Sequence, residues 1–315
     1  MANILVVGSM NMDIVTQVAH HPLPGETVQG LGTAFHAGGK GANQAVAAAR
    51  SGAAVAMAGG LGADVFGQDL RQRLMDEGME LSGIIEMSDA ATGVALITIE
   101  RAGENRIILS PGANGEYGPA EADALELNSY EAILLQNEIP LATCRRVMER
   151  AAAEGIPVFL NPAPIAGFDP ALMAHADYLV LNEVEAEVLS GLAIHDADAA
   201  ARAARKLLES GVSRLILTLG SQGSLYKDQE GLQIRMPAFR VEAVDTTAAG
   251  DTFIGAFAAR RTNGATVEEA LHYATAASAL AVTARGAQSS IPTEAQVASF
   301  LAEIGQSLDR SGPRP

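Results

Sequence analysis

Two aspartates flank a run of small and hydroxylated residues in the last third of the chain. Residues 244–253 read Val-Asp-Thr-Thr-Ala-Ala-Gly-Asp-Thr-Phe, and the aspartates are Asp245 and Asp251. The apolar segment that follows predicts a helix beginning at about Gly250 or Asp251. The first N–H groups of a helix lack partners within it and favour anions, and a carboxylate placed there can meet a substrate hydroxyl. Taken alone, Asp251 also fits an ordinary helix start and Asp245 a turn.

A glycine-rich segment precedes a second predicted helix. Residues 38–44 read Gly-Gly-Lys-Gly-Ala-Asn-Gln, and the Ala-rich helix after them is expected to end near Ser51. The glycines allow a ligand to approach the backbone closely, and Lys40 and Asn43 can reach it with their side chains. A Walker-type phosphate loop is excluded, because Ala34 stands where that motif has its first glycine and Gly41 where it has Ser or Thr. A plain glycine turn before a helix remains the alternative.

Further polar groups follow predicted strands. The apolar run 4–7 predicts a strand buried on both faces, and Asn11 and Asp13 come after it. Glu138 follows a strand expected at 132–135. The carboxyl ends of parallel strands share one edge, where ligands bind, so we expect these three side chains at a common rim. Amide and carboxylate groups there suit a polyol, although Glu138 by itself also fits a solvated loop.

Two more segments follow strands expected at 178–181 and 215–219. Asn182 and Glu185 are spaced to fit a helix cap or a site that orients a hydrated Mg²⁺, and both can hold together. The second segment offers hydroxyl and N–H groups suited to nucleotide phosphates, though turns of this composition are common. It consists of Thr218, Leu219, Gly220, Ser221, Gln222 and Gly223.

Strands and helices alternate along most of the chain. The pattern predicts further strands at 54–58 and 158–160 and helices at 65–78, 141–154, 199–210, 252–261, 266–283 and 293–307. Such alternation predicts a largely parallel sheet with helices on both faces.

Two insertions interrupt this pattern. Residues of about 14–35 and 93–110 contain runs that indicate exposed strands. We expect them to pair into a small sheet that covers the site as a lid and forms a homodimer interface. The expected organisation is one domain, 1–308, followed by a flexible tail, 309–315.

Composition limits the classes of partner. The 315 residues include 37 acidic and 21 basic side chains, a formal net charge of −16, which has the wrong sign for non-specific binding to nucleic acid or an anionic membrane. The single cysteine, Cys144, excludes an intrachain disulfide framework. No apolar segment approaches the ~18 residues of a membrane span, and the N-terminus lacks the basic region of a signal peptide. We therefore expect a soluble cytoplasmic protein.

Four segments together resemble the ribokinase branch of the PfkB sugar kinases. They are Gly-Gly-Lys-Gly-Ala-Asn-Gln (38–44), Asn-Pro-Ala-Pro (161–164), Asn-Glu-Val-Glu (182–185) and Asp-Thr-Thr-Ala-Ala-Gly-Asp (245–251). The resemblance extends in order from residue 4 to about 301. It implies a ribokinase-like α/β fold, with a central, mostly parallel sheet flanked by helices and a small β-sheet lid. The implied activity is ATP-dependent phosphorylation of D-ribose at its 5-hydroxyl, with ADP as the second product.

The resemblance also implies roles for the matching residues. Asp251 would be the base that orients the attacking hydroxyl, and the N–H groups of Ala248, Ala249 and Gly250 would form an anion hole. The sugar would be bound by Asn11, Asp13, Gly38, Gly39, Lys40, Asn43 and Glu138. ATP would be bound by Asn182, residues 218–223, Gly250 and Thr275, with Glu185 ordering Mg²⁺ through water. K⁺ would be coordinated by Asp245, Thr247, Ala281, Ala284, Gly286 and Ser290.

Phosphoryl transfer is compatible with a weak base such as Asp251. Its transition state is loose and carries charge on the equatorial oxygens, so positioning and electrostatics matter most. Asn11 favours ribose over a deoxy sugar, because a site built to bond a hydroxyl rejects analogues that lack it.

Other functions are weighed on the same residues. A PfkB kinase for deoxyribose, a keto-sugar or adenosine fits the same chemistry. A sugar-binding protein without turnover is less consistent, since Asp251 and Gly250 are both present. The sequence argues against a dinucleotide-dependent oxidoreductase, because no G-x-G-x-x-G motif follows a predicted strand.

Overall fold

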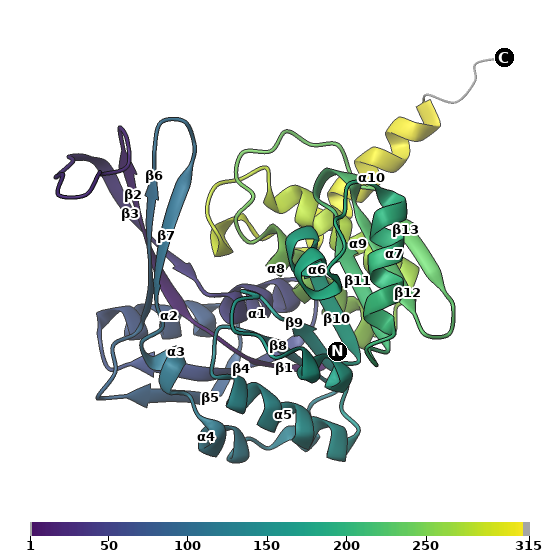
Figure 1. The fold of residues 1–315 in the computed structure, drawn as a ribbon, viewed down its shortest axis with the longest axis horizontal. Coiled ribbons are helices and arrows are strands. Elements are labelled where there is room, and N and C mark those ends of the chain that lie inside the picture. Colours follow the sequence, from purple (N-terminus) through teal and green to yellow (C-terminus); the bar gives the residue numbers. More distant parts are fainter. Residues whose placement is uncertain (1, 311–315) are drawn as a thin grey trace.

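A nine-stranded sheet forms the centre of the molecule (Figure 1). The computed structural model describes residues 2–310. The strands are β1 (Asn3–Val7), β4 (Ala54–Gly62), β5 (Glu80–Met87), β8 (Ala132–Gln136), β9 (Val158–Asn161), β10 (Tyr178–Asn182), β11 (Arg214–Thr218), β12 (Ser224–Asp228) and β13 (Gln233–Met236). Their order is β13-β12-β11-β10-β9-β8-β1-β4-β5. The strands from β11 to β5 are parallel, and β12 and β13 form an antiparallel edge.

Helices cover both faces of this sheet. The longer ones are α1 (Lys40–Arg50), α2 (Val65–Asp76), α5 (Leu141–Glu154), α6 (Glu183–Ser190), α7 (Ala197–Leu208), α8 (Ala249–Thr262), α9 (Val267–Ala281) and α10 (Glu294–Arg310). The short ones are α3 (Ala113–Glu116), α4 (Pro119–Asp123), η1 (Leu127–Ser129), η2 (Pro170–His175), η3 (Gly220–Gln222) and η4 (Gln288–Ser290).

The core has one hydrophobic cluster on each face of the sheet. In β1, Ile4 and Val6 join the cluster that contains α1, α2, α8 and α9, whereas Leu5 and Val7 join the one that contains α5 and α7. Alternate side chains of a strand point to opposite faces, so burial of both faces accounts for the continuous apolar run at 4–7. The predicted α/β class and mostly parallel sheet are thereby confirmed.

Two glycines bring α1 into direct contact with its neighbours. A Cβ on Gly41 would lie 2.6 Å from the backbone of Gly8 and Ser9, and one on Gly255 of α8 would lie 2.4 Å from the Gln44 carbonyl oxygen. The start of α1 therefore rests on the end of β1, and α8 packs backbone to backbone against α1. These contacts fix the spacing of the three elements that surround Asp251.

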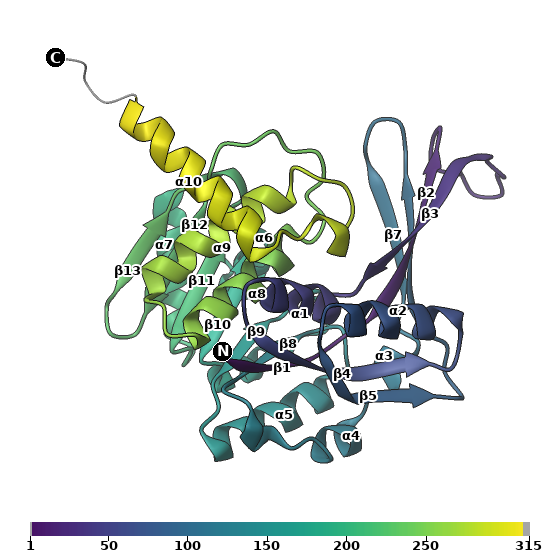
Figure 2. The ribbon, with the colours of Figure 1, turned by 180° about the vertical axis from the view of Figure 1, so that it is seen from behind.

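The second sheet has four strands and projects from the body in both views (Figures 1 and 2). Its strands are β2 (Asn11–Val18), β3 (Gly30–Gly38), β6 (Gly93–Ile99) and β7 (Asn105–Ser110), in the order β3-β2-β6-β7. The small sheet joins residues from both expected insertions through the parallel pair β2 and β6.

The boundaries of the first insertion differ from those expected. Asn11 and Asp13 lie within β2, paired with Gly38 and His36 of β3, rather than in a loop after β1. Their polar side chains resemble a loop in the sequence, yet residues 11–14 alternate between polar and apolar, which fits a strand. The small sheet therefore begins at residue 11 and its second strand ends at residue 38, outside the expected limits of 14 and 35.

Several other elements were not predicted or have different ends. Strand β5 and the β12–β13 hairpin were missed. β5 and β13 are the edge strands of the sheet and mix polar with apolar residues, and β12 is a short strand that ends in two charged residues. Helix α10 reaches Arg310, so residues 309 and 310 of the expected tail are helical, and residues 311–315 of that tail lie outside the described residues. Between residues 2 and 310, no helix is long and apolar enough to cross a membrane.

Candidate active site

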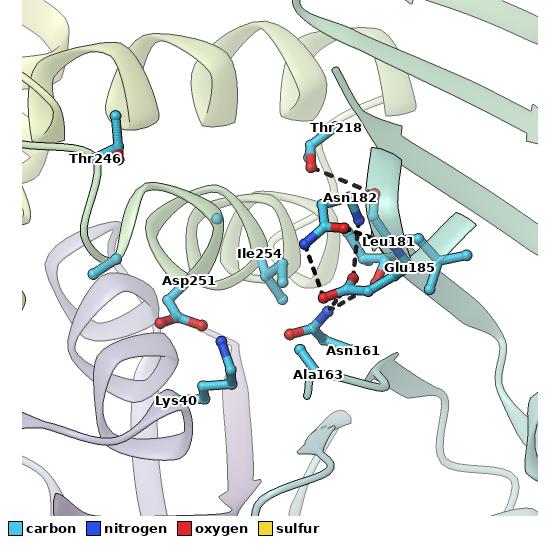
Figure 3. A pocket seen from close by; sticks show the side chains of 13 residues that line it. Lys40, Asn161, Ala163, Leu181, Asn182, Glu185, Thr218, Thr246, Asp251 and Ile254 are labelled. Carbon is cyan, nitrogen blue, oxygen red and sulfur yellow. Dashed lines mark hydrogen bonds between the residues drawn. The ribbon is translucent and has the colours of Figure 1, made fainter. Parts of the chain in front are cut away.

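A cavity of about 200 Å³ lies where α8 begins, opposite the carboxyl ends of β9, β10 and β11 (Figure 3). It is lined by Lys40, Asn161, Ala163, Val180, Leu181, Asn182, Glu185, Thr218, Thr246, Ala248, Gly250, Asp251 and Ile254. A larger cleft of about 820 Å³ opens beneath the small sheet and includes Asp13, His36 and residues 243–247. Thr246 lines both spaces, so the cavity and the cleft meet at the segment before α8.

Asp251 is buried in the first turn of α8, and two amides hold its carboxylate. Asn43 Nδ2 donates to Oδ2 at 3.0 Å, and Gln44 Nε2 donates to Oδ1 at 3.0 Å. The Lys40 side chain points toward the same carboxylate (Figure 3), and the charge of Asp251 raises the pKa of Lys40. The site thus holds a charged ammonium group beside an oriented carboxylate.

The turn before α8 has an unusual backbone. Ala248 has φ 59° and ψ 9° and is the one non-glycine residue between positions 2 and 310 with positive φ. Such a conformation costs roughly 1–2 kcal/mol for an L-residue. The Ala248 carbonyl accepts hydrogen bonds from the N–H and hydroxyl of Thr252, each at 2.8 Å. The turn places Ala248 and Gly250 on the cavity wall.

Helix α8 begins at Ala249, one residue before the earliest start that we expected. The change has a physical cause, since the left-handed residue Ala248 serves as its N-cap. Ser278 of α9 donates a hydrogen bond to the Ala249 carbonyl at 2.9 Å. Residues 248–250 therefore present the positive end of the 14-residue helix α8 to the cavity, as an anion site requires.

Glycines make room for the polar groups at the base of the cleft. A Cβ on Gly38 would lie 2.2 Å from Asp13 Oδ2. Gly39 has φ 89°, and a Cβ there would lie 2.8 Å from both the Asn11 nitrogen and the Ser9 carbonyl oxygen. Both positions therefore require glycine for close packing around Asn11 and Asp13.

Asn11 is held by a residue that sequence reasoning missed. Asn114 Nδ2 donates to Asn11 Oδ1 at 2.7 Å, and Asn114 also exchanges hydrogen bonds with the backbone of Met10. Because Asn11 Oδ1 is already bonded, its Nδ2 group is the part left to donate to a ligand.

Asp13 lies among other charges. Burial, together with the carboxylates of Glu138 and Asp251, raises the pKa of Asp13 to about 7. Its charge state therefore changes near neutral pH.

Glu138 joins three elements and was predicted as a sugar ligand. Its Oε2 atom accepts a hydrogen bond from the Ser9 hydroxyl and another, at 3.0 Å, from the Lys40 backbone N–H. Ser9 Oγ also accepts from the N–H of Gly41 at 3.3 Å. Glu138 thus secures the start of α1 against β1 and β8, and this contact was not anticipated.

Asn182 and Glu185 form a capping box at the start of α6. The Glu185 N–H donates to Asn182 Oδ1 at 2.8 Å, and the Asn182 N–H donates to Glu185 Oε2 at 2.9 Å. Asn161 Nδ2 lies 3.4 Å from the same carboxylate, and burial raises the pKa of Glu185. The side chains face the cavity (Figure 3).

A metal held by many protein ligands does not fit this site. Within residues 2–310, no group of three or more His, Cys, Asp or Glu side chains is arranged to hold a metal ion. Glu185 alone fits a hydrated Mg²⁺, because that ion keeps several waters and takes few protein ligands. Mg²⁺ bound there would neutralise charge on nucleotide phosphates.

The segment 218–223 follows β11 beside Asn182. Gly223 has φ 92°, and a Cβ there would lie 2.0 Å from the Met236 carbonyl oxygen, so the turn requires glycine. Thr218 lines the cavity. Thr275 does not: it lies on α9, and its hydroxyl donates to the Leu271 carbonyl at 2.7 Å.

The residues expected to bind K⁺ come from two segments that the structure brings together. Gly286 N–H donates to Asp245 Oδ2 at 2.9 Å, and the Val282 carbonyl accepts from the N–H groups of Val244 and Asp245. Thr247 donates through its N–H and hydroxyl to Asp245 Oδ1. Although partial burial alone would raise the pKa of Asp245, these hydrogen bonds lower it. Ser290 is buried and donates to the Ala287 carbonyl at 2.9 Å.

Four further residues shape the site without having been predicted. They are Ser9, Gln44, Asn114 and Gln136. Of the four, only Gln44 lies in a segment that the sequence marked as functional, the glycine-rich segment 38–44. The partners of all four lie far away in the sequence, so no spacing could reveal them.

The geometry supports transfer of a charged group to a hydroxyl. The oriented carboxylate of Asp251, the ammonium group of Lys40 and the helix N-terminus all face the cavity of about 200 Å³, which meets the larger cleft at Thr246. A hydroxyl that approaches Asp251 from the cleft would meet an anion held by residues 248–250 and Lys40. This is the arrangement that phosphoryl transfer requires.

Comparison with known proteins agrees. The model of the pfkB family of carbohydrate kinases matches residues 1–294. A ribokinase of Schizosaccharomyces pombe is 40% identical over 94% of this chain and 97% of its own length. A deoxyribokinase of Salmonella typhimurium is 36% identical over 95% of this chain and 98% of its own. The structure of Arabidopsis thaliana ribokinase in complex with ribose and ATP is 32% identical, covers 96% of this chain and 99% of that chain, and superposes with a TM-score of 0.87. The chain therefore belongs to the pfkB family of carbohydrate kinases.

Proposed function

We propose that this protein transfers the γ-phosphoryl group of ATP to the 5-hydroxyl of D-ribose, giving D-ribose 5-phosphate and ADP. The observation that carries the proposal is the placement of Asp251. It lies beside the helix start at 248–250, and Asn43 and Gln44 hold its two oxygens. The proteins similar to this chain in sequence and in structure include ribokinases.

Each side of the site has a role in this reaction. The sugar would lie in the cleft against Asn11, Asp13, Gly38, Gly39, Lys40, Asn43 and Glu138. Among the residues that the structure describes, none bonds the buried Asn43 Oδ1, as expected of an acceptor reserved for a hydroxyl. Asp251 would orient the attacking oxygen and take its proton, while Ala248, Ala249, Gly250 and Lys40 stabilise the transferring group.

The nucleotide would occupy the cavity of about 200 Å³ at the start of α8. Asn182 and residues 218–223 would bind ATP, and Glu185 would order hydrated Mg²⁺. Thr275 of α9 was also expected to contact ATP, but it is not among the residues that line this cavity, and its hydroxyl donates to the Leu271 carbonyl.

A bound K⁺ would support the anion site from behind. Asp245 and Thr247 directly precede residues 248–250, and they contact the 281–290 segment. A monovalent cation coordinated by Asp245, Thr247, Ala281, Ala284, Gly286 and Ser290 would fix the position of these N–H groups.

The main alternative is phosphorylation of 2-deoxyribose. It is favoured by the similarity to a deoxyribokinase. Asn11 argues for ribose, because an amide donor held in place by Asn114 would be left unpaired by a sugar that lacks the matching hydroxyl.

The test measures ADP release from Mg-ATP in the presence of K⁺. D-ribose, 2-deoxyribose, fructose and adenosine are compared, each with the wild-type protein and with Asp251→Asn. We expect D-ribose to give the highest kcat/KM, and Asp251→Asn to lower kcat by at least ~10³-fold.

The outcomes separate the alternatives. Preference for 2-deoxyribose would keep the reaction and reject the role given to Asn11. Turnover that survives in Asp251→Asn would reject the base. No turnover with any acceptor, together with ribose binding in calorimetry, would favour a sugar-binding protein.

A further inference from the structure

A chain of buried amides connects the central sheet to Asp251. Gln136, the last residue of β8, donates from Nε2 to Gln44 Oε1 at 2.7 Å. Gln44, on α1, donates from Nε2 to Asp251 Oδ1 at 3.0 Å. Gln44 is 0% exposed and Gln136 is 1% exposed. Neither glutamine lines the cleft proposed for the sugar or the cavity proposed for the nucleotide.

The backbone packs closely around this chain of amides. A Cβ on Gly8 would lie 2.0 Å from Gln136 Oε1, so the Gln136 amide rests directly on the backbone after β1. A Cβ on Gly255 would lie 2.4 Å from the Gln44 carbonyl oxygen, so the backbone that carries Gln44 packs directly against α8. These two contacts fix the positions from which the glutamine side chains extend.

Stability does not explain why polar groups occupy these positions. Within residues 2–310, Gln136 Oε1 is buried without a hydrogen-bond partner, and a buried polar group left unpaired is destabilising. Apolar side chains of the same shape would avoid this cost, since replacing both partners of a buried hydrogen bond can be neutral or stabilising. The amides therefore contribute something other than stability.

The direction of the hydrogen bonds indicates what that is. Each glutamine donates toward Asp251, so the chain ends on an acceptor, which an ionised carboxylate provides. Asn43 holds Oδ2, and Gln44 holds Oδ1. With both oxygens fixed, the carboxylate plane cannot rotate, and the remaining lone pairs point in defined directions.

We propose that Gln44, held in place by Gln136, is a positioning residue that sets the orientation of the Asp251 carboxylate for phosphoryl transfer. The proposal rests on the kinase function proposed above. A misplaced base lowers the rate of the chemical step without weakening ground-state binding. Gln44 should therefore affect kcat, whereas the KM values for sugar and ATP should change little.

The experiment compares Gln44→Met and Gln136→Met with the wild-type protein. Methionine matches glutamine in length and lacks its hydrogen-bonding groups. We expect kcat to fall by about 10–100-fold in Gln44→Met and by about 3–10-fold in Gln136→Met, with both KM values within about twofold of wild type. Thermal unfolding and ribose calorimetry show whether each variant is folded and binds sugar.

A double-mutant cycle separates positioning from a general structural role. In an Asp251→Asn background, single-turnover rates with and without Gln44→Met should agree within about twofold, because the carboxylate through which Gln44 acts is gone. An equal loss in both backgrounds would overturn the proposal, and so would a wild-type kcat in Gln44→Met.

A spectroscopic measurement tests the contact without turnover. The side-chain NH₂ resonances of Gln44 should shift in both variants. Asp251→Asn replaces the charged acceptor of the NH₂ group by a neutral amide, and Gln136→Met removes the donor to Gln44 Oε1. Unshifted resonances would overturn the chain of hydrogen bonds. An inactive wild-type protein with shifted resonances would reject the proposed function while retaining the contact.

Discussion

Asp13 is the titrating residue of the sugar cleft. Burial and two neighbouring carboxylates, Glu138 and Asp251, raise its pKa to about 7. Lys40 interacts with those two carboxylates, and His36 lies opposite Asp13 on β3. Hydrogen bonds to an ionised acceptor are stronger than those to a neutral one. The charge on Asp13 should therefore strengthen sugar binding.

We predict that the Kd for D-ribose falls several-fold between pH 6 and pH 8, measured by calorimetry. The folded-state pKa of Asp13 lies above its unfolded value, so its contribution to the free energy of unfolding is present at low pH. That contribution is lost as the pH rises from about 4 through about 7. Asp13→Asn should bind ribose more weakly. In this variant the change of the ribose Kd with pH and the contribution of Asp13 to the pH dependence of the free energy of unfolding should both be lost. A pH dependence of ribose binding that is unchanged in Asp13→Asn would assign it to another group.

Asn114 controls which end of the Asn11 amide faces the sugar. Asn114→Asp replaces the donor to Asn11 by an acceptor, so Asn11 should turn and present its oxygen to the cleft. We predict that kcat/KM for D-ribose falls about tenfold, the effect of roughly 1.4 kcal/mol, and that kcat/KM for 2-deoxyribose changes less.

Asn3→Leu is the matched control, since it removes a half-buried amide at the opposite end of β1, which donates to the Ser129 carbonyl. Its ratio of the two kcat/KM values should equal that of wild type. An equal loss for both sugars in Asn114→Asp would contradict a role in specificity.

At the scale of elements, Arg50 joins the ends of two helices to the loop after α9. It lies in the last turn of α1, forms a half-buried ion pair with Glu77 at the end of α2, and donates to the carbonyls of Gln288 and Ile291 at 3.0 and 2.6 Å. That loop contains Gly286 and Ser290, which we propose as K⁺ ligands. Arg50 should therefore stabilise the loop in the shape that binds the cation.

We predict that wild-type activity disappears when a bulky organic cation replaces K⁺, and that Arg50→Met raises the K⁺ concentration for half-maximal activity about fivefold. Loss of these bonds should also lower the free energy of unfolding by about 2 kcal/mol. Activity measured against K⁺ concentration, with urea unfolding in parallel, checks both. Arg73→Met, which removes an exposed arginine paired with Asp69 on α2, should match wild type. Full activity without K⁺ would reject the cation site.

At the scale of the whole molecule, the small sheet has apolar side chains that the described chain leaves exposed. Leu96 and Ile108 lie opposite each other on β6 and β7 and are 45% and 68% exposed, and Phe35 of β3 lies in the same cross-strand row and is 55% exposed. A cluster of this kind indicates an interaction surface. Its occupant is proposed to be the same sheet of a second copy.

We predict a homodimer at micromolar concentration that Ile108→Asp converts to a monomer, measured by sedimentation velocity. A carboxylate buried at an apolar interface is costly, and two copies would repel each other. Leu232→Asp is the control, because Leu232 is also exposed but lies in the β12–β13 turn of the other sheet; it should stay dimeric. A wild-type monomer would reject the proposal.

The sequence by itself determined the fold class and the chemical groups of the site. Buried parallel strands give continuous apolar runs, as at 4–7, and helices give their own periodicity, so the order of elements could be predicted locally. The glycine-rich segment and the run that ends at Asp251 were recognised because backbone conformation and helix starts impose residue types on short stretches.

Only the tertiary structure decided how these groups are held. Gln44 and Asp251 are 207 positions apart, and Asn11 and Asn114 are 103 apart, so no local pattern links them. The polar residues of β2 resembled a loop until their pairing with β3 and β6 was known. The left-handed conformation of Ala248 depends on contacts of the surrounding turn. Orientation of a side chain arises from packing between distant segments, and a single sequence carries little local signal of it.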